Sequence, residues 1–131
     1  MRTATARCTI LLAALGVTAA TPGCSGGRPE FTISPDEMAI SDLVDALNDN
    51  ADKPAKAAVL FVKGSAPDAN QLKLYKDYTY NLTNRPDVGG TEVTAPIRVT
   101  TIKDKDQKST TRDWTFEKDG AGWKIKSAPL P

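Results

Sequence analysis

The chain has 131 residues, a quarter of them charged, and its 17 Lys and Arg stand against 16 Asp and Glu for a net charge of +1. The two signs are interleaved without a basic block, which argues against nucleic-acid binding, since that needs a concentrated positive surface. The chain contains no histidine, so it lacks the most common general base, the most common zinc ligand and any Ser-His or Cys-His nucleophilic pair. A chain of this length supports one hydrophobic core, and we expect a single folded domain.

The first 23 residues have the composition of an export signal. Two arginines give a positive start, and an uninterrupted apolar run follows over residues 9–20. The small and turn-forming residues Thr21-Pro22-Gly23 then lead into Cys24. This order of positive, apolar and small segments is typical of secretory signals. The apolar run is also shorter than the roughly 20 residues that a membrane-spanning helix needs. We therefore expect residues 1–23 to direct export and to be removed.

Cys24 resembles the lipidation site of bacterial lipoproteins, because it follows a glycine at the end of the apolar segment. In that family the thiol is diacylated and the signal is cut immediately before the cysteine. The family usually has a leucine and a small residue where this chain has Thr21-Pro22. The alternative is an ordinary signal peptide cut after Ala20, which leaves Cys24 as a free thiol. The resemblance covers residues 1–27 and implies an exported protein, lipid-anchored to the extracytoplasmic face of the cell membrane.

Residues 24–33 are predicted to tether the domain to that anchor. Glycines make the start of this segment flexible, and Pro29 stiffens its end. Cys8 lies within the signal, so the mature chain keeps one cysteine and has no intramolecular disulfide or cysteine metal cluster. The mature chain also loses two arginines, and fifteen basic against sixteen acidic residues give a net charge of about −1. Because two acyl chains hold a protein stably where one does not, we expect permanent anchoring.

A first helix is predicted to begin at Ser34, which with Glu37 forms a capping box. Pro35 occupies the first helical position, where its missing N–H costs nothing. Apolar residues at helical spacing then predict one buried face, formed by Ile40, Leu43, Val44 and Leu47. The helix is expected to end at residues 48–50.

A second helix is predicted over residues 52–64, capped by Asp52 and stopped by Gly64. Its expected apolar stripe consists of Ala55, Ala58, Val59 and Val62. A weaker helical turn is expected within residues 65–74.

From Tyr78 onward the apolar residues recur with period 2, which is typical of strands. The predicted strands cover residues 78–82, 91–102, 109–117 and 123–126. Pro96 lacks an N–H, so we expect the second strand to bulge there or to lie at an edge. The segment 119–122 predicts a tight hairpin turn. Residues 34–131 are thus predicted to form one α+β domain, with N-terminal helices packed against a curled antiparallel sheet of about four strands.

Two segments carry a further resemblance, LYKDYTYNL at residues 74–82 and DWTFEKDGAGWKIK at residues 113–126. An aromatic strand, a Lys-Asp-Gly turn and then Trp-Lys-Ile, placed after two helices, resemble the small nuclear transport factor 2-like (cystatin-like) domains of many bacterial lipoproteins. The resemblance covers roughly residues 34–127. It implies a cone-shaped domain in which the sheet wraps around the first helix, often with a pocket at the open end. Much of this group has no assigned activity.

Six aromatic residues are the candidate lining of such a pocket, because their strand faces would converge in a wrapped sheet. They are Tyr75, Tyr78, Tyr80, Trp114, Phe116 and Trp123. Aromatic side chains with few polar groups commonly line small-molecule pockets. The alternative, and the commoner case in so short a chain, is that they fill the core.

Candidates for catalysis and metal binding are weak. Enzymes on the resembled scaffold often use an Asp-His pair, which the missing histidine excludes, or an Asp base with Tyr and a protonated Asp. Asp77 lies among the tyrosines, but strand alternation points it away from the face that Tyr78 and Tyr80 share, as a solvated carboxylate. Residues 104–106 begin like a calcium loop, but the glycine and the glutamate needed further along that loop are missing. We expect no catalytic residue, no metal and no cofactor.

Three classes of function remain open. The favoured one is a non-catalytic binding or accessory module that recognises a small apolar ligand or an envelope protein. The second is a structural domain that forms a homodimer through an open sheet face, although that face is rich in threonine (Thr100, Thr110, Thr111 and Thr115). The third is a small enzyme of the nuclear transport factor 2-like type.

Overall fold

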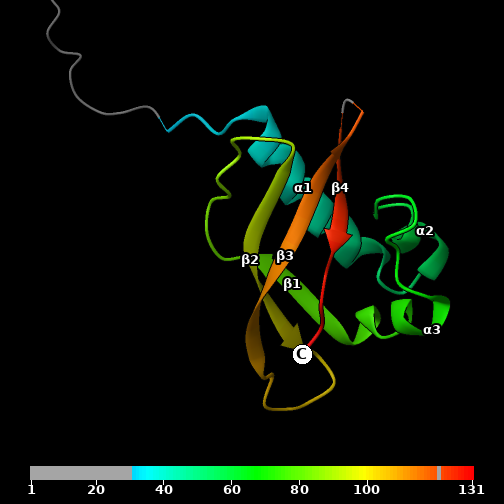
Figure 1. The fold of residues 1–131 in the computed structure, drawn as a ribbon. Coiled ribbons are helices and arrows are strands. Elements are labelled where there is room, and N and C mark those ends of the chain that lie inside the picture. Colours follow the sequence, from blue (N-terminus) through cyan, green and yellow to red (C-terminus); the bar gives the residue numbers. More distant parts are fainter. Residues whose placement is uncertain (1–30, 121) are drawn as a thin grey trace, which may run out of the picture. The chain divides into compact units, whose positions relative to one another are not determined.

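The computed structural model describes residues 31–120 and 122–131. The predicted signal peptide, Cys24 and most of the predicted tether lie outside this part of the chain. Ile33–Pro131 form one compact unit in which helices are followed by an antiparallel sheet (Figure 1), and the predicted α+β class is confirmed. Within the described residues, no helix is both long enough and apolar enough to span a membrane.

The elements follow the chain in a simple order. The helices are α1 (Pro35–Asn50), α2 (Pro54–Ala58), α3 (Ala69–Leu72) and the 3₁₀ helix η2 (Tyr75–Asp77), and the strands are β1 (Tyr78–Leu82), β2 (Glu92–Thr101), β3 (Ser109–Asp119) and β4 (Gly122–Ser127). The strands are ordered β1-β2-β3-β4 and each pair is antiparallel. Because α1 packs against both outer strands, β1 and β4, the sheet curls around it as a half-barrel (Figure 1). This arrangement is compatible with the nuclear transport factor 2-like cone.

The first helix begins as the sequence predicts. The Ser34 hydroxyl accepts a hydrogen bond from the Glu37 N–H at 3.2 Å, and the Glu37 carboxylate accepts one from the Ser34 N–H at 2.7 Å. Arg85 also binds this carboxylate, and its guanidinium, followed by the Ser34 N–H, lowers the pKa of Glu37 to about 2. The buried face of α1 consists of Ile40, Val44 and Leu47. The start of α1 is therefore fixed to the loop that follows β1.

The predicted helix over residues 52–64 is wrong in its length and in its buried face. α2 ends at Ala58, and its N-cap is Lys53, which makes no side-chain hydrogen bond to the helix. The buried residues of this segment are Ala57 and Phe61, whereas Val59 is 65% exposed. The chain leaves the helix early because Phe61 pairs with a strand.

This pairing closes the outer edge of β4. The Ile125 N–H donates to the Leu60 carbonyl and the Val62 N–H donates to the Ile125 carbonyl, both at 2.8 Å. The result is a parallel bridge between Phe61 and Ile125. Gly64, whose φ of 86° favours glycine, then turns the chain after it leaves β4. The pairing of Phe61 with β4 thus outweighs the helical spacing of apolar residues in this segment.

The second strand buries the face that the sequence predicts, made of Val93, Ala95, Ile97 and Val99. The bulge expected at Pro96 is absent, because β2 keeps a continuous register with β3 through the pair Pro96–Asp113. Pro96 instead lies where β1 ends, and its carbonyl accepts the Thr83 N–H at 3.1 Å. Its missing N–H therefore falls at the end of the β1–β2 ladder, although β2 itself is a central strand with β1 on one side and β3 on the other. The irregularity of the sheet lies between β3 and β4, at Thr115/Phe116.

Asn48 of α1 closes the outer edge of β1. Its side-chain amide donates to the Tyr80 carbonyl and accepts from the Tyr80 N–H, both at 2.8 Å. The amide thus occupies the place of a neighbouring strand. Since exposed strand edges invite pairing with other chains, Asn48 and the segment 60–62 protect the two sides of the sheet.

The Asn48 contact predicts a stability difference between two similar substitutions in α1. Asn48→Ala leaves both backbone groups of Tyr80 without their partner and should lower the free energy of unfolding by about 1–3 kcal/mol. Asn50→Ala removes only a bond from the Asn50 amide to the Ala46 carbonyl, and should change it by about 0.5 kcal/mol or less. Urea denaturation measures both, and equal midpoints for the two variants would contradict the role of Asn48.

Candidate functional site

The structure places most of the six candidate aromatic residues in the core. Those that are buried are Tyr75, Tyr80, Trp114, Phe116 and Trp123, while Tyr78 is half-buried. Tyr75 lies in η2 and not on a strand face as expected. Phe61, which the sequence prediction omitted, joins them because α2 ends early.

Four rings form a row through the domain. Phe61 contacts Tyr75 edge-to-face at a centroid distance of 6.1 Å, and Tyr75 contacts Tyr80 at 5.9 Å. Tyr80 in turn packs on Trp114 at 5.0 Å with the ring planes tilted by 49°. Tilted and edge-to-face pairs at such distances stabilise proteins beyond the burial of their area. The row joins the segment after α2 to the centre of the sheet.

The polar atoms of this row hold the C-terminal tail, residues 128–131. The Tyr75 hydroxyl donates to the Ala128 carbonyl at 2.5 Å, and the Trp114 Nε1–H donates to the Pro129 carbonyl at 3.2 Å. The Tyr80 hydroxyl donates to the Tyr75 carbonyl at 2.6 Å. Burial raises the pKa of Tyr75 to about 12 and raises the pKa of Tyr80 as well. Both phenols therefore stay protonated donors over any physiological pH, and their role is structural.

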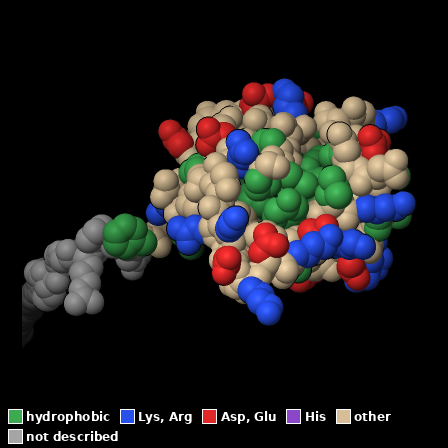
Figure 2. Space-filling model, turned by 90° about the horizontal axis from the view of Figure 1, so that it is seen from below, with side chains coloured by type: hydrophobic (Ala, Val, Ile, Leu, Met, Phe, Trp, Pro, Cys, Tyr) green, Lys and Arg blue, Asp and Glu red, His purple; other side chains and the backbone are tan. Residues whose placement is uncertain are grey.

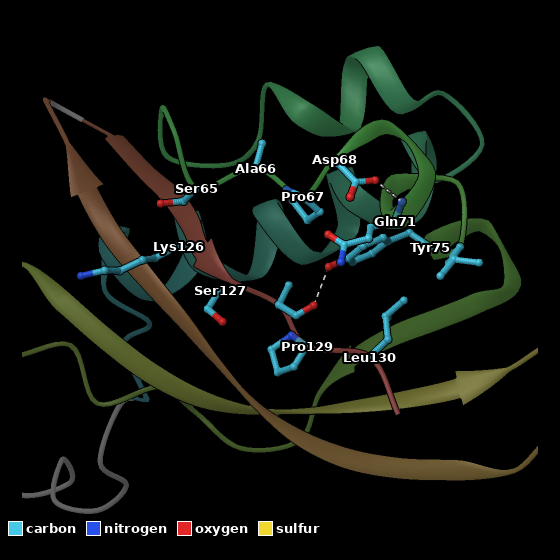
Figure 3. A pocket seen from close by; sticks show the side chains of 12 residues that line it. Ser65, Ala66, Pro67, Asp68, Gln71, Tyr75, Lys126, Ser127, Pro129 and Leu130 are labelled. Atoms are coloured by element: carbon cyan, nitrogen blue, oxygen red, sulfur yellow. Dashed lines mark hydrogen bonds between the residues drawn. The ribbon is translucent and has the colours of Figure 1, made fainter.

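A cavity of about 480 Å³, the C-terminal hollow, opens beside this tail. One wall is the loop 65–68, and the opposite wall is the end of β4 with the tail, residues 126–130. Gln71 of α3, Leu74 and Tyr75 complete the lining (Figure 3). Seen from below Figure 1, the domain shows hydrophobic side chains gathered near the middle of the face with charged side chains around them (Figure 2). The hollow is lined by apolar and polar side chains together.

The charges around the hollow are unequal. Asp68 is the one carboxylate among the described residues that line it, and its Oδ1 accepts the N–H groups of Asn70 and Gln71 at 2.8 and 2.9 Å. The Lys126 amine points away from the other labelled side chains in Figure 3. It is held by Glu92 and by Glu117, which raise the pKa of Lys126. The one described cation that lines the hollow is therefore paired with Glu92 and Glu117, and not with Asp68.

A second cavity of about 500 Å³ lies along the outer edge of β1. Tyr78 and Tyr80 line it together with Asn48 and the exposed Ile102. The six candidate aromatic residues are thus divided, since Tyr75 lines the C-terminal hollow and Tyr78 and Tyr80 line this cavity. Trp114, Phe116 and Trp123 line neither of the two.

Asp77 does not join the tyrosines as a catalytic group. Its carboxylate binds the Lys103 amine at 2.6 Å, and its side chain is only 15% exposed. It is therefore an ion-paired residue and not the solvated carboxylate expected from the sequence. Its backbone carbonyl accepts the Ile102 N–H at 2.9 Å, so Asp77 fixes the end of β2 to η2.

The polar side chains that line the two cavities carry mainly hydroxyl, amide and carboxylate groups. The Asp and Glu side chains of the described residues form no group of three or more that could hold a metal ion. Every buried side-chain polar atom of the described residues has a hydrogen-bond partner, so the core holds no unpaired polar side-chain group. No family model and no curated protein matches the chain.

The tail contact predicts a specific effect of Tyr75→Phe. This change leaves the buried Ala128 carbonyl without its donor and should lower the free energy of unfolding by about 1–2 kcal/mol. Tyr78→Phe is the matched control. The Tyr78 ring is half-buried, and its hydroxyl makes no hydrogen bond to the described residues. A free energy of unfolding for Tyr75→Phe equal to that of Tyr78→Phe would contradict this contact.

Proposed function

We propose that the protein is an exported lipoprotein, acylated at Cys24, which holds a non-catalytic binding module at the extracytoplasmic face of the cell membrane. The order of the N-terminal segments is the main support for the anchor. A sequence typical of export signals leads directly into Cys24, and a glycine-containing segment that could act as a tether follows. The folded unit begins at Ile33, only nine residues after that cysteine. Such a short link keeps the module near the membrane.

The fold supports the second half of this proposal. A helix wrapped by a curled sheet is the arrangement expected of a nuclear transport factor 2-like domain, a scaffold whose function depends on the site it carries. Here the C-terminal hollow is a concavity in which apolar residues such as Pro67, Leu74 and Leu130 lie beside several polar groups that could orient a ligand. Its polar side chains include those of Ser65, Asp68, Gln71 and Ser127, together with Lys126, whose amine is held by Glu92 and Glu117. We see no activated nucleophile with an adjacent base among them. The hollow is therefore proposed to bind and not to catalyse.

Metabolic labelling with a radioactive or clickable fatty acid tests the anchoring directly. The wild-type protein should incorporate the label and stay with the membrane fraction, and Cys24→Ala should lose both properties. Cys8→Ala is the control, because it removes the other cysteine from a segment that is cleaved away. Labelling that persists in Cys24→Ala would overturn the proposed anchor.

A further inference from the structure

The C-terminal hollow has the geometry of a wedge between two diverging chain segments. Phe61 and Val62 run alongside β4 at Ile125. After Gly64 the loop 65–68 forms the wall of the hollow opposite the last residues of β4 and the tail. Figure 3 shows this loop and Gln71 facing Ser127, Pro129 and Leu130 across the open space. A wedge that begins where a strand pairing ends suits an extended chain more than a compact ligand.

The tail wall carries backbone groups that an extended chain could use. Residues 128–131 make no backbone–backbone hydrogen bond to another described residue. The two side-chain bonds from Tyr75 and Trp114 engage carbonyls. The N–H of the partly exposed Leu130 has no such partner, whereas Ala128 is buried. An amide-containing ligand can pair with such groups, whereas a hydrocarbon chain cannot.

The negative charge of Asp68 favours an amide-containing ligand that also carries a positive group. The Oδ1 atom of Asp68 is occupied as the N-cap of α3, and its Oδ2 atom has no hydrogen-bond or ion-pair partner among the described residues. The Lys126 amine, the one cation on the rim, is already held by Glu92 and Glu117 on the outer face of the sheet. A ligand with a positive group would therefore meet Asp68 without competition, and Leu74, Tyr75 and Leu130 would accept an apolar neighbour.

We propose that the C-terminal hollow binds an extended peptide segment of another envelope protein, in which a basic side chain is adjacent to an aliphatic one. The peptide lies between the loop 65–68 and the tail. Its basic side chain pairs with Asp68 and its aliphatic side chain packs against Leu74 and Leu130. This inference names the ligand class of the site proposed above, and it rests on that proposal for its location in the envelope.

The test uses fluorescein-labelled peptides and the mature, acylated protein in lipid nanodiscs. One pentapeptide has a leucine followed by a lysine among alanines, and the other has glutamate in place of the lysine. Fluorescence anisotropy should show binding of the lysine peptide and much weaker or no binding of the glutamate peptide. In the Asp68→Asn variant the affinity for the lysine peptide should fall about two- to fivefold, the effect of an exposed ion pair. Higher salt should weaken the wild-type binding for the same reason.

Asp68→Asn removes the charge and keeps the helix cap, because asparagine caps helices as well as aspartate does. The helix α3 should therefore persist, and the urea midpoint should stay unchanged. Asp87→Asn removes an exposed carboxylate outside the hollow and is the matched control. Equal binding of both peptides, equal loss in both variants, or no binding at millimolar peptide would overturn the proposal. None of these results affects fatty-acid labelling at Cys24, so failure of the peptide site and failure of the anchor are distinguishable.

Discussion

The packing of α1, the sheet and the C-terminal tail depends on Tyr80, which lies in β1 and contacts α1. Its backbone is bound on one side by Asn48 of α1, and its ring packs between those of Tyr75 and Trp114. Its hydroxyl fixes the Tyr75 carbonyl. Tyr75 and Trp114 then direct their own donors at the C-terminal tail. One buried residue thus connects the first helix, the sheet and the last residues of the chain.

The same arrangement separates the core from the candidate binding site. The aromatic rings are covered by α1 on one side and by the tail on another, so their burial contributes to stability. The tail that covers them also forms one wall of the C-terminal hollow. The hollow is therefore a consequence of how the core is closed, and its shape depends on the two bonds that hold the tail.

The elements that the sequence predicts well are those set by local rules. The capping box of Ser34 and Glu37, the alternating face of β2 and the turn between β3 and β4 depend on residues close together in the chain. The early end of α2 could not be predicted in this way, because Phe61 leaves the helical pattern to pair with Ile125, more than sixty residues later. The hollow was missed for the same reason, since its walls come from residues 65–68 and 126–130. The aromatic residues were found from sequence, but only tertiary packing decides which of them face a cavity.

The aromatic row fills the core, and we propose that recognition takes place at the surface hollow. Native mass spectrometry of the mature protein, purified gently from its own host and compared with its denatured mass, tests this most directly. The account predicts that both measurements give the mass of the acylated chain, because an open hollow does not retain a small molecule through purification. A small apolar molecule that is retained in the native state and lost on denaturation would contradict it, since such a ligand would require the aromatic residues to line an enclosed pocket.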